Sequence, residues 1–289
     1  MNSILNSLKI NLLHAGYTKL DNNWHYENVI SPFSRIVYVT KGSAVIHHTN
    51  QTFYLKPGHM YLIPSYIYNR YQCEIYHKQY YVSFFDEIKY GLSLYNFKNF
   101  IYEVEANEFD IDYFKRLVEI NPNMGIKDSN PKTFVNRSYM KKIHGKEKNL
   151  ITNYYIETKG IISILLSRFI KNSSHPHKQK SIEGDLNKVI IYIAQNLHTS
   201  ISIEKLAAYC SLNTDYFSRA FKEKFEIRPH KYIQQKRIER AQLLLLTTYY
   251  SLKKIANEVG FKDVSHFSKT FKVHTNESPS RYRKEHLSV

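Results

Sequence analysis

The feature that most constrains this chain is a repeat in its last hundred or so residues. Residues 203–207 (IEKLA) resemble residues 252–256 (LKKIA) at an offset of 49. Residues 217–222 (FSRAFK) resemble residues 267–272 (FSKTFK) at an offset of 50, so the second copy has one extra residue between its two segments. Self-similarity at a nearly fixed offset indicates two copies of one supersecondary unit.

Each copy predicts a helix, a short turn and a second helix. A short polar residue stands where the N-cap of each of these helices is expected, namely at Ser202, Asn213, Ser251 and Asp263. Gly260 suits the turn of the second copy because glycine permits a positive φ angle, and Ser211 stands at the equivalent place in the first copy. The small Ala207 and Ala256 allow the two helices of each pair to cross closely.

In the second helix of each copy, the sequence indicates which face is buried. Its phenylalanines recur four residues apart and predict a buried stripe, Phe217 and Phe221 in one copy and Phe267 and Phe271 in the other. The opposite face then points outward and holds the candidate DNA-binding side chains: Asp215, Ser218, Arg219 and Lys222 in the first copy, and Val264, Ser265, Ser268, Lys269 and Lys272 in the second. In a major groove, arginine and lysine pair with guanine, serine bonds either way and valine meets a thymine methyl. Two solvated helices of an all-α bundle are the alternative, which leaves the repeated turn unexplained.

The segment between the copies predicts a spacer. Residues 229–246 form one expected helix with Pro229 in its first turn, and 18 residues give a length of about 27 Å. Such a rod can hold two recognition helices on one DNA face, roughly 34 Å apart. After the second copy, Ser278 and Pro279 predict a short helix whose Arg281 and Arg283 are expected to contact phosphates.

The N-terminal half has a strand pattern in place of the helical one. From about residue 35 to residue 85, short runs rich in β-branched and aromatic residues alternate with turn residues, which predicts a small antiparallel barrel or sandwich. After Asp110 the pattern becomes helical, and residues 151–169 predict a longer amphipathic helix. Its apolar face either docks on its own domain or pairs with the same helix of a partner subunit; its members are Tyr155, Ile161, Ile162, Leu165, Leu166 and Phe169.

These segments predict an α+β chain of two domains. Residues 171–181 (KNSSHPHKQKS) lack apolar periodicity and are expected to form a linker. The linker separates an N-terminal domain, residues 1–170, from an all-α DNA-binding domain with two helix-turn-helix units, residues 182–289.

Composition sets the broad class. The formal charge of +16 favours a polyanionic partner such as nucleic acid. Cys73 and Cys210 lie far apart and outside any metal-ligand spacing, which fits a reducing compartment. A signal peptide is not expected at the N-terminus, and no run of 18 apolar residues predicts a membrane span, so a soluble cytoplasmic protein is the expectation.

The predicted sheet region offers polar and aromatic side chains for a small-molecule pocket, namely Trp24, His25, Arg35, Tyr38, His47 and Tyr61. The alternative is that most of these aromatic residues are ordinary strand residues. A metal-dependent enzyme of this architecture needs two histidines and a carboxylate converging on an ion. The adjacent His47 and His48 point to opposite faces of a strand and no acidic residue follows at short range, so neither a metal, a cofactor nor an enzyme is expected.

The second copy resembles the signature of the AraC/XylS regulators. The residues that carry the resemblance are Ile255, Ala256, Val259, Gly260, Phe261, Asp263, Ser265, His266, Phe267, Ser268, Phe271, Lys272, Ser278, Pro279, Tyr282 and Arg283. It covers roughly residues 186–284, with Arg237, Ala241, Leu243 and Leu244 of the linking helix also fitting, and implies a cupin-like N-terminal barrel that senses an effector and dimerises. Where the family usually has glycine, this chain has Asn276 and, in the first copy, Glu226, which predicts a different local turn there. Asp215 predicts a weaker contribution of the first copy to DNA binding.

We therefore expect a sequence-specific transcriptional regulator that binds double-stranded DNA and senses a small molecule, with a sugar as the candidate. A homodimer is expected, and RNA polymerase is a further candidate partner. The alternative is a protein that binds nucleic acid without sequence preference, through charge alone.

Overall fold

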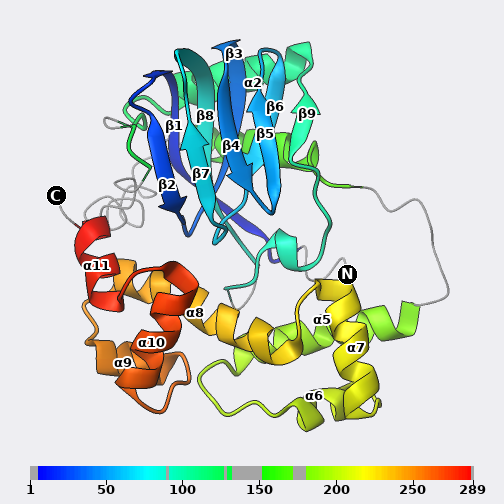
Figure 1. The fold of residues 1–289 in the computed structure, drawn as a ribbon. Helices are drawn as coiled ribbons and strands as arrows, with labels where there is room; N and C mark the ends of the chain where they lie inside the picture. The colour runs from blue at the N-terminus through cyan, green and yellow to red at the C-terminus, as the bar shows by residue number, and fades with distance from the viewer. Residues whose placement is uncertain (1–5, 89–90, 127–128, 132–151, 172–179, 288–289) are drawn as a thin grey trace. The chain divides into compact units, whose positions relative to one another are not determined.

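The computed structural model describes residues 6–88, 91–126, 129–131, 152–171 and 180–287 (Figure 1). The chain divides into two compact units. The sheet unit comprises the described parts of residues 1–87, 98–171 and 285–289, and the helical unit those of residues 88–97 and 172–284. The predicted linker, residues 171–181, lies almost wholly outside the described residues.

The sheet unit contains two antiparallel sheets. One has the strand order β1-β8-β3-β6-β9, formed by Lys9–Asp21, Tyr76–Glu87, Ser34–Gly42, His59–Ile63 and Glu103–Glu105. The other has the order β2-β7-β4-β5, formed by His25–Val29, Asn69–Gln72, Ala44–His48 and Gln51–Leu55. The strands expected between residues 35 and 85 are confirmed, and the antiparallel, cupin-like architecture with them. The long β1, which pairs with β8 along most of its length, was not anticipated.

Alternating side chains of both sheets fill one core, which holds Val37, Val39, Ile46 and Tyr71 among others. Gly42 makes a tight passage between strands possible. Its φ is +76°, and a Cβ there would lie 2.1 Å from the carbonyl oxygen of Tyr76, so only glycine fits.

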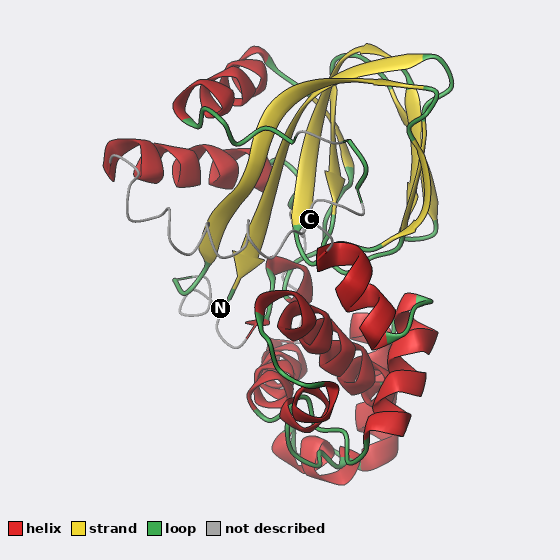
Figure 2. Cartoon of the chain, turned by 90° about the vertical axis from the view of Figure 1, so that its left-hand side faces the viewer, coloured by secondary structure: helices red, strands yellow, loops and turns green. Residues whose placement is uncertain are grey.

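Two helices, α2 (Glu108–Ile120) and α4 (Thr152–Ser167), pack against β1, and α2 also packs against β8 (Figure 2). Asn107 caps α2 by accepting a hydrogen bond from the Asp110 amide at 2.9 Å. The Arg116 guanidinium joins the helices by donating to both carboxylate oxygens of Glu157, at 2.6 and 3.0 Å. Most of the apolar face predicted for α4 is buried within this unit, including Ile162 and Leu165.

The helical unit contains seven α-helices among its described residues (Figure 1): α5 (Lys180–Gln195), α6 (Ile203–Tyr209), α7 (Thr214–Phe225), α8 (Pro229–Thr247), α9 (Leu252–Glu258), α10 (Val264–Thr275) and α11 (Pro279–Leu287). A short helical turn, η2 (Leu94–Asn96), belongs to the same unit although it lies between β8 and β9 in the sequence. In the part of the chain that the structure describes, no helix combines the length and the apolar character needed to cross a membrane.

The buried His48 of β4 predicts how stability depends on pH. Its side chain is 3% exposed and its ring stacks on Phe53, with 4.6 Å between ring centroids. Burial lowers the pKa of His48 to about 4, against about 6.5 in an unfolded chain. Because the unfolded chain binds the proton more tightly, stability that is present above pH 6.5 is lost as the pH falls towards 4.

We expect this histidine to lower the free energy of unfolding by about 2 kcal/mol between pH 7 and pH 5. Denaturant unfolding at both pH values measures the effect, and His48→Gln should reduce the difference between the two. The exposed His25, changed to Gln, is the matched control. An equal loss of stability in His48→Gln and in the parent protein would contradict the assignment.

Candidate nucleic-acid interface and ligand cavity

The two helix pairs, α6–α7 and α9–α10, are built by the same local interactions. Ser202 and Ser251 cap the first helix of each pair, accepting from the Lys205 and Lys254 amides at 3.2 and 3.1 Å. In both turns an amide returns to the carbonyl of the small alanine: Leu212 to Ala207 at 3.0 Å, and Phe261 to Ala256 at 2.9 Å. The repeat seen in the sequence is therefore a repeat of backbone hydrogen bonds.

The second helix of each pair is also capped as predicted. Asn213 accepts from the Tyr216 amide at 2.8 Å, and Asp263 accepts from the His266 amide at 2.6 Å. At their C-terminal ends, Glu226 and Asn276 adopt the same left-handed conformation, with φ of 59° and 58°. The prediction of a different turn at Glu226 is therefore wrong, because the glutamate accepts the same backbone geometry.

Burial of the phenylalanines decides which face each helix presents. Phe217, Phe221, Phe267 and Phe271 are completely buried. The nine side chains predicted on the opposite faces of α7 and α10 are all solvent-accessible: Asp215, Arg219, Lys222, Ser265, Lys269 and Lys272 are exposed, and Ser218, Val264 and Ser268 are half-buried. Tyr216 and His266, which were not among the predicted DNA-binding residues, are exposed beside them. Their place one residue before a core phenylalanine was the signal that could have identified them.

The two faces differ in charge. Helix α7 carries Asp215 and Glu223 among its basic residues, whereas α10 contains no acidic residue. The outward face predicted for α10 therefore carries one more positive charge than that of α7, although the exposed Asp263 caps α10.

The two arginines predicted to contact phosphate have different surroundings. Arg281 is exposed near the N-terminal end of α11. Arg283 is half-buried and donates from Nη2 to the carbonyl oxygen of Tyr250 at 2.6 Å, so its guanidinium fastens α11 to the start of the second helix pair.

The sheet unit holds a cavity of about 200 Å³. It is lined by residues of β1, β3 and β8 and of two loops, namely Thr18, Lys19, Leu20, Trp24, Arg35, Gln79, Tyr81, Ile126 and Ser129. Arg35 is buried, donates from Nε to the Ser83 hydroxyl at 3.2 Å, and has its pKa lowered by that burial. The Trp24 indole donates to the Ser129 carbonyl at 3.2 Å, and the Tyr81 hydroxyl accepts from the Ile126 amide at 2.7 Å. The cavity thus presents both polar groups and an aromatic wall.

Of the six predicted pocket residues, Trp24 and Arg35 line this cavity. Tyr38 does not, because it lies on the other face of β3 and stacks on Phe114 of α2, with 6.0 Å between ring centroids. His47 faces outward, with Nε2 2.8 Å from Arg70 Nη2, and His25 is exposed on β2. The expectation that His47 and His48 point to opposite faces of β4 is confirmed, since His48 is buried.

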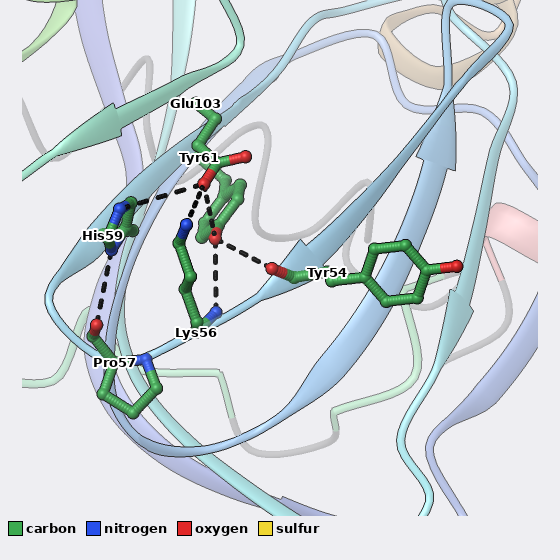
Figure 3. Close-up of polar contacts among 6 residues, drawn as sticks. All are labelled: Tyr54, Lys56, Pro57, His59, Tyr61 and Glu103. Atoms are coloured by element: carbon green, nitrogen blue, oxygen red, sulfur yellow. Dashed lines mark hydrogen bonds and ion pairs between the residues drawn. The ribbon is translucent and has the colours of Figure 1, made fainter.

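Tyr61 lies apart from the cavity lining although its ring is in the core (Figure 3). Its hydroxyl is 3.0 Å from the Tyr54 carbonyl oxygen and 3.3 Å from Glu103 Oε1, and it accepts from the Lys56 amide at 3.2 Å. Glu103 Oε1 also pairs with Lys56 Nζ at 3.3 Å. Tyr61 therefore ties the turn after β5 to β9 instead of facing a ligand.

The cavity residues that the sequence analysis missed come mainly from β1 and β8. Gln79 and Tyr81 are alternate residues of the run QYYVSFF, and this alternation was the available signal. Among the described residues, no group of three or more histidine, cysteine, aspartate and glutamate side chains is arranged to hold a metal ion.

Comparisons with known proteins match the sheet unit and the helical unit to two different domain families. The model of the AraC-like ligand-binding domain matches residues 11–82, and a helix-turn-helix domain model matches residues 206–285. The raffinose operon transcriptional regulatory protein RafR of Pediococcus pentosaceus is 38% identical over 107 residues, which cover 37% of this chain and 38% of RafR. The probable transcriptional regulator LumQ of Photobacterium leiognathi is 35% identical over 124 residues, which cover 42% of this chain and 50% of LumQ. The matched part of this chain thus spans half or less of the length of these relatives.

A solved structure resembles nearly the whole chain. The crystal structure of unsaturated fatty acid bound ToxT from Vibrio cholerae covers 98% of this chain and 97% of its own, with a TM-score of 0.50 and 16% sequence identity. At that identity, the likeness shows the fold alone.

Proposed function

Because this chain belongs to the AraC family, we propose that it is a transcriptional regulator that binds double-stranded DNA in a sequence-specific manner. The observation that carries the proposal is the duplicated helix pair, whose second helices α7 and α10 leave polar and basic side chains accessible. The proposal assigns effector sensing to residues 1–170 and DNA binding to residues 182–289, joined by residues 171–181. It places the protein in the cytoplasm with its DNA.

In this proposal, α7 and α10 each enter a major groove and α8 sets their separation. The 19 residues of α8 correspond to about 28 Å along its axis, which is close to one helical turn of DNA. Arg219 and Lys269 stand at equivalent places on the two helices and would read bases, while Arg281 would contact phosphate. Arg283 would act indirectly, by holding α11 in place.

We propose further that the cavity of the sheet unit binds the effector, and that a sugar is the leading candidate. Arg35, Gln79 and Thr18 offer donors and acceptors for hydroxyl groups, and Trp24 offers an aromatic face against which a sugar ring can pack. RafR, which is named for the raffinose operon, supports the same class of ligand.

A route from the cavity to the DNA-binding helices follows from the chain itself. Strand β8 carries Gln79 and Tyr81 on the cavity wall and leads into residues 88–97, which belong to the helical unit. There, Asn96 donates from Nδ2 to the Tyr232 hydroxyl at 3.1 Å, and Phe97 packs on the core of the α6–α7 pair. We propose that a shift of β8 on effector binding changes the population of DNA-binding states through this segment.

We also propose that the protein forms a homodimer through α4. Leu165 and the other buried residues of α4 pack within its own unit, but Ile156 and Ile164 are 63% and 42% exposed and lie within about 80° of each other around the helix axis. RNA polymerase remains a further candidate partner.

Base reading predicts a specific loss of affinity. Lys269→Ala and Arg219→Ala should each weaken binding to a duplex selected from random sequences on the order of tenfold, and binding to unselected duplex far less. Lys188→Ala, which removes an exposed lysine of α5, is the control for charge alone. Fluorescence anisotropy at fixed salt measures both affinities. Equal losses on selected and unselected DNA would favour the alternative, nucleic-acid binding without sequence preference.

Effector binding should be visible through Trp24, the single tryptophan of the chain and part of the cavity wall. Titration with a panel of mono- and disaccharides should give a saturable change of its fluorescence with one of them. Thr18→Val, which removes a cavity hydroxyl, should weaken that binding several-fold, because a lost hydrogen bond costs about 1 kcal/mol. Thr40→Val is the matched control, since Thr40 bonds Lys78 away from the cavity. An unchanged titration in Thr18→Val would argue against this site.

The homodimer proposal makes a prediction about assembly. Ile164→Glu should convert a dimer into a monomer, because it would place two charges in an apolar contact between copies. Sedimentation velocity measures the change, and Tyr54→Glu, at an exposed position of β5, should leave the dimer intact. A dimer that survives Ile164→Glu would mean that this face of α4 is not the contact.

A further inference from the structure

We propose that Arg237 is a positioning residue, which clamps the two helix-turn-helix pairs at one mutual orientation and thereby sets the spacing of the DNA sites that the protein accepts. The inference rests on the proposed DNA-binding function. It concerns the helical unit alone, in which α8 runs between the α6–α7 pair and the α9–α10 pair (Figure 1).

The first half of the clamp ties α8 to the first helix pair. The Arg237 side chain donates from Nε to the carbonyl oxygen of Leu197 at 3.1 Å, and from Nη2 to that of Thr199 at 2.7 Å. Both acceptors lie in the segment that follows α5, and Leu197 packs against the core of the α6–α7 pair. Hydrogen bonds from a charged donor are among the stronger ones, so the middle of α8 is fastened to this segment.

The second half of the clamp reaches the second helix pair. The guanidinium carbon of Arg237 lies 5.9 Å from the ring centroid of Phe261, in the turn between α9 and α10. In the same turn, a Cβ built on Gly260 would lie 2.2 Å from the Leu197 carbonyl oxygen and 2.9 Å from Arg237 Nη2. The turn of the second pair therefore rests directly on the carbonyl group that Arg237 holds.

Two independent features favour glycine at position 260. The first is its φ of +83°, which lies beyond the +55° that Ser211 adopts at the equivalent place of the first pair and is rare for residues with a side chain. The second is the close approach to Leu197 and Arg237, which leaves no room for a Cβ.

The clamp supplies what α8 alone does not fix. Helices α9 and α10 pack on α8, which sets where the second pair lies along the axis of α8, and the Arg237 contacts add a direct link between the turn of that pair and the segment after α5. Two recognition helices must match two grooves at once, and freedom between them costs affinity when DNA binds. A guanidinium shared by α8, the segment after α5 and the second turn removes that freedom before DNA arrives.

The clamp can be tested without DNA by measuring the distance between the recognition helices. Nitroxide labels at Lys222→Cys and Lys272→Cys, both exposed, report this distance by double electron–electron resonance in full-length protein with Cys73 and Cys210 changed to Ala. We expect one narrow distribution for the parent and a broadened or shifted one for Arg237→Met, with partial recovery in Arg237→Lys. Arg240→Met, which removes an exposed charge from the same helix, should match the parent. A distribution unchanged by Arg237→Met would overturn the proposal.

A second pair of variants covers the case in which Arg237→Met does not fold. Gly260→Ser should displace the distribution, because its Cβ would meet the Leu197 carbonyl oxygen and Arg237 at a backbone angle that already favours glycine. Ser211→Gly, the reciprocal change in the first turn, should leave the distribution as in the parent. Identical distributions in these two variants would overturn the proposal as well.

DNA spacing provides the functional readout. The probe is a duplex recovered by selection with the full-length protein. It is compared with the same duplex carrying about 5 extra base pairs, half a helical turn, between the two segments that α7 and α10 of one chain contact. We expect the insertion to weaken parent binding at least about tenfold, and to weaken Arg237→Met binding by less than about threefold. Arg240→Met should behave as the parent does, and an undiminished spacing penalty in Arg237→Met would contradict the clamp. If the parent selects no DNA, the proposed function fails, whereas the distance measurement still decides the clamp.

Discussion

Each recognition helix can present only the face that its phenylalanines leave outside. Phe217 and Phe221 anchor α7, and Phe267 and Phe271 anchor α10, all completely buried. Removing one such side chain costs about 3 to 5 kcal/mol, so rotation of either helix about its axis is strongly opposed. The same burial that stabilises the helical unit therefore selects which polar and basic side chains are available to a partner. Capping by Asn213 and Asp263 then fixes where each helix begins.

The proposed function gives the two units different tasks: the sheet unit encloses a small molecule, and the helical unit presents side chains to DNA. One sheet and two loops line the cavity, which can remove a small molecule from water and so suits recognition by a buried arginine, an amide and an indole. The paired helices instead leave side chains of α7 and α10 exposed to solvent. In the route proposed above, the segment after β8 would link these tasks, because residues 88–97 follow a strand of the cavity wall and Asn96 bonds Tyr232 in the helical unit. In this account, DNA binding is regulated by the position of β8, which depends on whether the cavity holds an effector.

Local features of this fold could be predicted from the sequence, and long-range ones could not. The four N-caps and the core faces of α7 and α10 depend on residues three or four apart, and all are confirmed. Arg35 and Tyr38 are three residues apart in β3 and therefore point to opposite faces, but which face lines the cavity depends on how the sheet packs, and Tyr38 was expected in the pocket that Gln79 and Tyr81 line. Glu226 was expected to change its turn because glutamate disfavours the left-handed conformation. That conformation costs only about 1 kcal/mol, which packing outweighs. The contact between Gly260 and Leu197 joins distant parts of the chain and leaves no local pattern.

The central claim is that α7 and α10 are presented together to consecutive grooves on one face of a single duplex. Hydroxyl-radical footprinting of full-length protein on a selected duplex tests this most directly, because it maps contacts base by base along both strands. The account predicts two protected patches per protein chain, about 10 base pairs apart and on the same face of the helix. A single patch per chain, or two patches on opposite faces, would contradict it.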